Sequence, residues 1–196
     1  DYFARDSKRG GAWMSSLRCQ QKLTGDVRPI ILNIMNFTKA ANSQPTLLSI
    51  DDAKTLFHEF GHALHGILSN VTYPLISGTN VERDFVELPS QLFEHWLLEP
   101  EVLRVFARHC ETNEPISPEI INRIIESNRF NQGFNTVEFC ASALIDMKIH
   151  QQTDIESLDL NKFETEQLKL IGMPEGIVMR HRLPHFAHIF SGDGYS

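Results

Sequence analysis

The sequence predicts a mainly α-helical fold with a small β element near its start. Apolar residues recur three or four positions apart in several segments after residue 49, which is the pattern of helices with one buried face. A strand-like pattern is confined to the first 37 residues. The chain has 196 residues, of which 41% are hydrophobic and 22% charged, so it is long enough to bury a core without disulfides. Since no repeat or linker divides it, we expect one domain over residues 1–196.

Residues 10–15 predict a short strand, and residues 28–37 predict a longer one. The longer segment, RPIILNIMNF, is rich in β-branched residues and follows a turn at Gly25-Asp26. Residues 39–45 are polar and contain turn-forming residues, so they predict a loop. Both strands are therefore expected to precede the helices.

A first helix is predicted from residue 50 to about residue 68. Ser49 suits the N-cap, and Asp51 and Asp52 place negative charge in the first turn, where the helix dipole favours it. We expect the core-facing stripe of this helix to comprise Ala53, Leu56, Phe57, Phe60, Ala63, Leu64, Ile67 and Leu68. A separate polar stripe beside it comprises Thr55, His58, His62, His65 and Ser69.

A second helix is predicted over residues 86–98, bounded by Pro100, with Pro89 marking either its first turn or a kink. Ser117-Pro118 is a strong helix start, because serine suits the N-cap and proline suits the first helical position. The remaining predicted elements are a loop over 73–83, helices over 135–150 and 161–171, and a connector over 172–184.

Charge, apolar runs and cysteines exclude several classes of protein. The chain carries 18 Lys and Arg against 25 Asp and Glu, a net charge of -7, which argues against nucleic acid as a partner. No apolar run approaches the roughly 18 residues of a membrane span, and no signal segment is present, so no membrane partner is expected. The three cysteines are odd in number and widely spaced, which argues against disulfides and predicts the cytoplasm. Because the sequence starts at Asp1 and ends at Ser196 without polar tails, we expect a fragment of a longer protein.

The first predicted helix contains the motif HExxH, as His58-Glu59-Phe60-Gly61-His62. Four residues of an α-helix advance the chain by a little more than one turn, so His58 and His62 lie on one face about 6 Å apart along the axis. Two imidazoles at this spacing can bind one metal ion. Glu59 lies beside the first of them and is placed to act as a general base without being a ligand.

A catalytic zinc site needs a third protein ligand. His65 lies about 10 Å along the helix axis from His58. On a straight helix, one ion cannot be bound by His58, His62 and His65 together. The remaining candidates are acids further along the chain, namely Glu82, Asp84, Glu87 and Glu94.

These acids differ in their surroundings. Glu87 and Glu94 belong to a polar stripe on the second predicted helix, whereas Glu82 lies in a loop. Glu87 could instead form a capping box with Asp84, three residues upstream. Glu94 could orient a ligating imidazole without binding the metal.

Longer motifs around these residues resemble the thimet oligopeptidase family of zinc metallopeptidases. They are TLFHEFGHALH at 55–65, SGTN at 77–80, DFVELPSQ at 84–91 and EHW at 94–96, with KRGGAW at 8–13 and HFAHIF at 185–190. The resemblance extends over essentially the whole chain. The sequences around Gly-Thr-Asn and Arg-Asp-Phe-Val-Glu are more similar to the bacterial peptidyl-dipeptidase (dipeptidyl carboxypeptidase) branch than to the oligopeptidase A branch.

The resemblance implies one zinc ion (Zn²⁺) bound by His58, His62 and Glu87, with Glu59 as the general base. It also implies that His188 and Tyr195 bind the substrate backbone or the developing oxyanion. The fold implied is a zincin-like metallopeptidase catalytic core, of which residues 1–196 form a single domain within a larger protein. Short unstructured peptides are the implied partners.

The sequence thus predicts a zinc metallopeptidase that hydrolyses short peptides and releases C-terminal dipeptides. One alternative is internal cleavage of the oligopeptidase A type. The other is a truncated module that binds metal or peptide without turnover. The sequence does not predict an oligomeric state.

Overall fold

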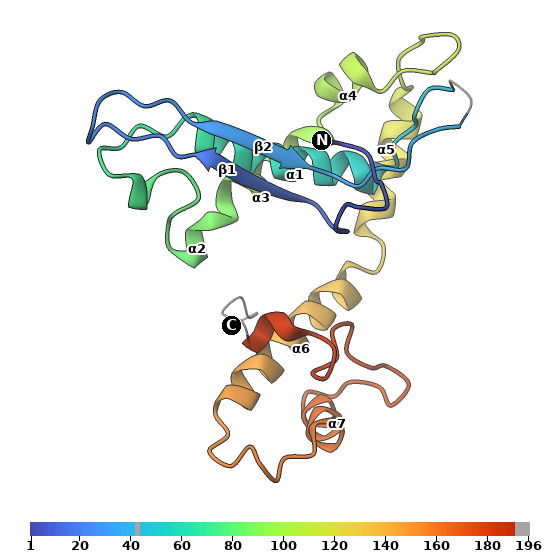
Figure 1. The fold of residues 1–196 in the computed structure, drawn as a ribbon. Coiled ribbons are helices and arrows are strands. Elements are labelled where there is room, and N and C mark those ends of the chain that lie inside the picture. The colour runs from blue at the N-terminus through green and yellow to red at the C-terminus, as the bar shows by residue number, and fades with distance from the viewer. Residues whose placement is uncertain (42–43, 191–196) are drawn as a thin grey trace. The chain divides into compact units, whose positions relative to one another are not determined.

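The computed structural model describes residues 1–41 and 44–190. Two compact units make up the chain, the first over residues 1–123 and the second from residue 124 onward. The predicted fold class is confirmed, because the described residues are mainly helical with one small sheet (Figure 1). The expected single domain over residues 1–196 stays a prediction, since one domain can contain two compact units. Among the described residues, none of the helices combines the length and the hydrophobicity that a membrane span requires.

Among the described residues, β1 (Trp13–Arg18) and β2 (Ile30–Ile34) form a two-stranded antiparallel sheet. Trp13 lies opposite Ile34, and the register is irregular between Ser16 and Arg18. Both predicted strands are present, although β1 begins three residues later than predicted. Gly11 explains the delay, since its φ of 95° places it in a turn that a strand cannot include.

The segment before β1 is tied to the end of β2 by a buried lysine. The Lys8 side chain is almost fully buried, and its Nζ donates to the carbonyl oxygens of Asp1, Phe3 and Met35. The Asp1 carboxylate lies 3.3 Å from the same ammonium group. A buried lysine is tolerated here because its donors and its charge have partners.

The first helix, α1 (Ile50–Ile67), begins where the sequence predicts. Ser49 is its N-cap and forms a capping box with Asp52: the Asp52 amide donates to Ser49 Oγ at 3.0 Å and the Ser49 amide to Asp52 Oδ2 at 3.1 Å. Two of the four amides left unpaired at a helix start are thereby satisfied. Local sequence alone therefore sets this end of the helix.

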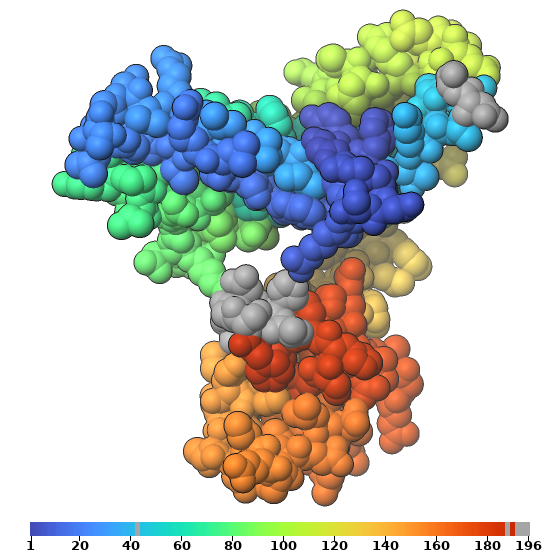
Figure 2. Space-filling model, viewed as in Figure 1, coloured from blue at the N-terminus to red at the C-terminus, as the bar shows by residue number. Residues whose placement is uncertain are grey.

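The predicted core-facing stripe of α1 is partly wrong. Phe60 is 43% exposed and Ile67 and Leu68 are also exposed, whereas Glu59, Gly61, His62, Ala63 and Gly66 are buried. The sheet packs against one side of α1, and the helix α3 packs against another side. Small residues of α1 at these contacts allow the sheet and α3 to approach its backbone closely. In Figure 1 the sheet lies in front of α1, and in Figure 2 its atoms hide much of the helix.

Short helices follow α1 in the first unit. They are the 3-10 helix η1 (Pro74–Ile76), α2 (Arg83–Val86), α3 (Leu88–Leu97) and α4 (Pro100–Phe106). The predicted second helix corresponds to α3, and Pro89 lies in its first turn, where its missing N–H costs no hydrogen bond. The helix α4 was not predicted, because Pro100 is expected to bound the preceding helix, whereas it is the first residue of α4.

Gly61 sets how closely α1 and α3 approach. A Cβ at this position would lie 2.6 Å from Ser90 Cα and 2.7 Å from the Pro89 carbonyl oxygen, so the α3 backbone would have to shift. We expect Gly61→Ala to lower the free energy of unfolding by about 1–3 kcal/mol, as overpacking does, in urea denaturation. Gly66→Ala is the matched control, because its Cβ would meet the flexible end of the Ile31 side chain at 2.7 Å. Equal losses at the two positions would contradict this account.

The second unit is built on α6 (Gln132–His150) and α7 (Leu160–Leu170), followed by a connector and the 3-10 helix η2 (Ala187–Phe190). The preceding helix α5 (Pro118–Arg129) begins at the predicted Ser117-Pro118 start and spans the boundary between the units. The core of the unit comprises Ala141, Ile145, Ile149, Phe163, Leu168, Met179, Leu183 and Ile189. Buried Glu164 accepts hydrogen bonds from Arg182 Nε at 2.9 Å and the Leu183 amide at 3.0 Å, which ties the connector to α7.

Candidate metal centre

Three side chains from α1 and α3 converge at one point. Glu87 Oε2 lies 3.2 Å from His58 Nε2 and 3.2 Å from His62 Nε2. The two imidazole rings are 4.9 Å apart between centroids and nearly perpendicular. Among the described residues, His58, His62 and Glu87 are the group of ligand side chains whose donor atoms lie within 4.8 Å of one another. The structure therefore brings together the three residues predicted to bind zinc.

Glu87 reaches this point because of where it lies between two helices. It is the N-cap residue of α3, directly after α2 ends, and its side chain makes no capping hydrogen bond. Asp84 lies inside α2, whose N-cap is Glu82, so the predicted alternative of a capping box between Asp84 and Glu87 is not formed. Its carboxylate is free to face α1, and the close contact of Gly61 with α3 brings it within reach of both histidines.

The donor set fits a zinc ion. Two imidazole nitrogens and one carboxylate oxygen are ligands that Zn²⁺ accepts, and three protein ligands leave the fourth position open. His62 is 8% exposed, and burial lowers its pKa although the nearby Glu87 carboxylate acts in the opposite direction. The neutral imidazole, which is the form that binds metals, is thereby favoured.

His58 is held by the carboxylate of Glu94. The distance from His58 Nδ1 to Glu94 Oε1 is 2.6 Å, so the contact suggested from the sequence is present. An Nδ1–H donated to this carboxylate leaves Nε2 as the free acceptor on the side of Glu87. Lys54 Nζ lies 3.1 Å from the other oxygen of Glu94. Lys54 was not among the predicted site residues, although its position one turn before His58 places both residues on the same helix face.

Glu59 lies next to this centre but is not part of it. The residue is 7% exposed, and its Oε2 is buried without a hydrogen-bond partner within the described structure. Burial raises the pKa of Glu59, the charge of His58 acts to lower it, and the charge of Glu87 raises it further. A backbone hydrogen bond from Met14 also lowers it and shows that β1 borders the centre. A buried carboxylate with a spare oxygen and a raised pKa has the properties of a general base.

The other acids and His65 lie elsewhere. Glu82 occupies the N-cap position of α2 and makes no capping bond. The ring of His65 lies 6.0 Å from the ring of Phe85, its Nδ1 is buried without a hydrogen-bond partner in the described structure, and burial lowers its pKa. His65 is outside the group of converging donor atoms found among the described residues, and its predicted role as a non-ligand stays a prediction.

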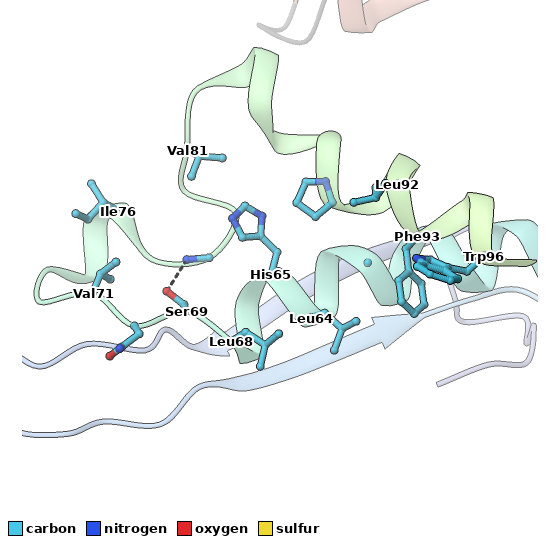
Figure 3. Close-up of a pocket in the computed structure, with 14 residues that line it drawn as sticks. Leu64, His65, Leu68, Ser69, Val71, Ile76, Val81, Leu92, Phe93 and Trp96 are labelled. Atoms are coloured by element: carbon cyan, nitrogen blue, oxygen red, sulfur yellow. Dashed lines mark hydrogen bonds between the residues drawn. The ribbon is translucent and has the colours of Figure 1, made fainter.

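An open hollow of about 560 Å³ lies between α1, the loop after it and α3. Its lining is mostly apolar and includes Leu64, Leu68, Leu92, Phe93 and Trp96. In Figure 3, His65 extends from α1 towards the loop that carries Val81, whereas Leu64 and Leu68 extend to the other side in this view. The amide of Gly78 donates to Ser69 Oγ at 3.1 Å and joins the loop to the end of α1 (Figure 3).

The side chains of two predicted site residues lie outside what the structure describes. His188 belongs to η2, but its side chain is not among those described, and Tyr195 lies beyond the described residues. Their predicted contact with substrate stays a prediction.

Known proteins are similar to this chain over its whole length. The family model for Peptidase family M3 matches residues 1–196. The chain is 41% identical to the dipeptidyl carboxypeptidase of Salmonella typhimurium over 199 residues and 40% identical to that of Escherichia coli K12 over 202 residues. It is 34% identical to oligopeptidase A of Escherichia coli K12 over 201 residues. Each alignment covers 100% of this chain and 29% of the relative, so the chain spans less than a third of the length of these curated relatives.

Proposed function

The chain belongs to Peptidase family M3, with the zincin-like fold that the sequence predicts, and on that premise we propose that it carries the catalytic centre of a zinc peptidase acting on short peptides. The observation that supports this most directly is the convergence of His58, His62 and Glu87 beside a buried carboxylate. Imidazole, imidazole and carboxylate ligands are typical of a catalytic zinc site.

In this proposal the chain's residues divide into two tasks. His58, His62 and Glu87 hold the ion through the three atoms that face one another. A bound zinc ion would lower the pKa of water and polarise the scissile carbonyl. Glu59 takes one proton from the attacking water, and later gives it to the nitrogen of the leaving amine as the peptide bond breaks. Glu59 Oε2, which has no hydrogen-bond partner among the described residues, provides the oxygen for this transfer.

β1 is suited to present an extended peptide to this centre. Its Met14 backbone contacts Glu59, and among the described residues β1 pairs with β2 along one edge only. An extended chain can add to an open strand edge through backbone hydrogen bonds, which requires no particular side chains. This mode of binding favours short unstructured peptides as substrates.

We assign His188 and Tyr195 to the stabilisation of charge on the carbonyl oxygen, from the resemblance alone. A single hydrogen-bond donor to a developing oxyanion contributes about 3–4 kcal/mol to transition-state stabilisation. Both residues can donate such a bond, through an imidazole N–H and a phenolic O–H.

The proposed reaction is release of dipeptides from the C-terminus, because the identity of 40–41% to two dipeptidyl carboxypeptidases exceeds the 34% to oligopeptidase A. We expect a peptide with a free C-terminal carboxylate to be shortened by two residues at a time, as seen by mass spectrometry of the products. The same peptide with an amidated C-terminus should be cleaved much more slowly. Internal fragments formed equally from both peptides would instead indicate oligopeptidase activity. Zinc binding without any cleavage would indicate a binding module.

A further inference from the structure

Ser90 is a completely buried hydroxyl at the contact between α1 and α3. Its exposed fraction is 0%, and its Cα is the atom that a Cβ on Gly61 would approach to 2.6 Å. A buried hydroxyl costs free energy unless it has a hydrogen-bond partner. Both acceptors that Ser90 contacts belong to one residue, Glu87: its carbonyl oxygen at 2.9 Å and its Oε2 at 2.8 Å.

The Glu87 oxygen that Ser90 contacts is the one that faces the histidines. Oε2 lies 2.8 Å from Ser90 Oγ and 3.2 Å from Nε2 of both His58 and His62. A carboxylate oxygen has two lone pairs, so Oε2 can accept the Ser90 hydrogen and still direct the other lone pair towards an ion between the imidazoles.

The carboxylate of Glu87 stands at the end of a long side chain that such support would fix in place. Its side chain is 48% exposed, and it makes no capping hydrogen bond to α3. A long side chain loses rotamer freedom when it binds a metal ion, and this loss costs free energy. A hydrogen bond that selects the binding rotamer beforehand reduces that cost. His58 has a comparable support in Glu94.

We infer that Ser90 is a positioning residue for the metal centre, which holds the Glu87 carboxylate in the rotamer that binds the ion. The inference rests on the proposed metal site. Ser90 does not touch the substrate, and it acts only through Glu87. A hydroxyl at this buried position therefore serves the ligand in addition to filling the space between two helices.

The test is the zinc affinity of the purified protein, measured by competition with a chromophoric chelator. Ser90→Ala removes the hydroxyl oxygen and adds no atom. We expect it to weaken zinc binding by about 10- to 100-fold, which is the usual effect of removing a residue that hydrogen-bonds to a metal ligand. Ser142→Ala is the matched control, since Ser142 is also a buried helical serine, and its Oγ donates to the Glu138 carbonyl oxygen at 3.2 Å in the second unit. This control should bind zinc like the parent.

A double substitution distinguishes the positioning role of Ser90 from a purely structural role. If Ser90 acts through the carboxylate, adding Ser90→Ala to Glu87→Ala should weaken zinc binding no further, and the metal-free single variant should unfold near the temperature of the metal-free parent. An unchanged affinity of Ser90→Ala, or an equal loss with Glu87 absent, would overturn the inference. Because the measurement is affinity, a parent that binds zinc without hydrolysing peptides would refute the proposed function alone. A parent that binds no zinc would refute both.

Discussion

Glu59→Gln is expected to reduce kcat for peptide hydrolysis by about 10²- to 10⁴-fold, the usual contribution of a general base. The amide has nearly the shape of the carboxylate but cannot accept the proton of the attacking water. Zinc content should stay that of the parent, because Glu59 is not among the three converging ligands. Burial raises the pKa of Glu59, so its charged form is disfavoured in the folded protein, and a neutral amide is not expected to lower stability.

Two measurements check this result: metal content of the purified variant and initial rates on a fluorogenic peptide. Glu101→Gln is a suitable control, because Glu101 is an exposed acid in the first turn of α4. It should match the parent in both measurements. If the Glu59 variant hydrolysed the peptide as fast as the parent, another group would have to be the base. If the Glu59 variant lost its zinc, the role of Glu59 would be in metal binding rather than in proton transfer.

Glu87→Gln should weaken zinc binding more than the roughly 10- to 100-fold typical of losing an outer hydrogen-bond partner. The reason is that it replaces a charged ligand oxygen lying 3.2 Å from each imidazole nitrogen with a neutral amide. Glu82→Gln should leave zinc affinity unchanged, since Glu82 lies outside the converging group. Dialysis against a chelator, followed by metal analysis, distinguishes the two variants.

The comparison between Glu87 and Glu82 decides the identity of the third ligand. Both are acids in one short stretch, and both occupy N-cap positions without capping hydrogen bonds, which makes them a matched pair. Faster loss of zinc from the Glu82 variant would show that the carboxylate contact seen here does not represent the metal-bound protein. Similar retention by both variants would show that neither carboxylate binds the ion.

The sequence predicted those helix starts that depend on interactions between residues close together in the chain. The start of α1 follows from Ser49 and Asp52, which lie within one turn of each other, and α5 follows from Ser117-Pro118. The pairing of His58 with His62 follows from the geometry of a single helix. The start of α4 was not predicted, because a proline such as Pro100 is compatible both with the end of one helix and with the first turn of the next.

Packing reversed one prediction made from periodicity. The apolar spacing along α1 indicated that Phe60 faces the core, but Phe60 is 43% exposed, whereas Glu59 and His62 are buried. Periodicity identifies an apolar stripe but does not say which neighbouring elements approach the helix. Gly61 and Gly66 permit the closest approach of α3 and the sheet, so the buried face lies on their side.

The sequence by itself determined that two imidazoles and a glutamate stand on one helix in the arrangement of a metal centre, because that arrangement needs only the helical repeat. The helical repeat left four acids as candidates for the third ligand, and among them the family resemblance implied Glu87. Only the tertiary structure decided that Glu87 meets both histidines and that Glu94 contacts His58. The physical reason is that these contacts join residues of α1 to α3, and their distances depend on how two helices pack at Gly61 rather than on the conformation of either helix.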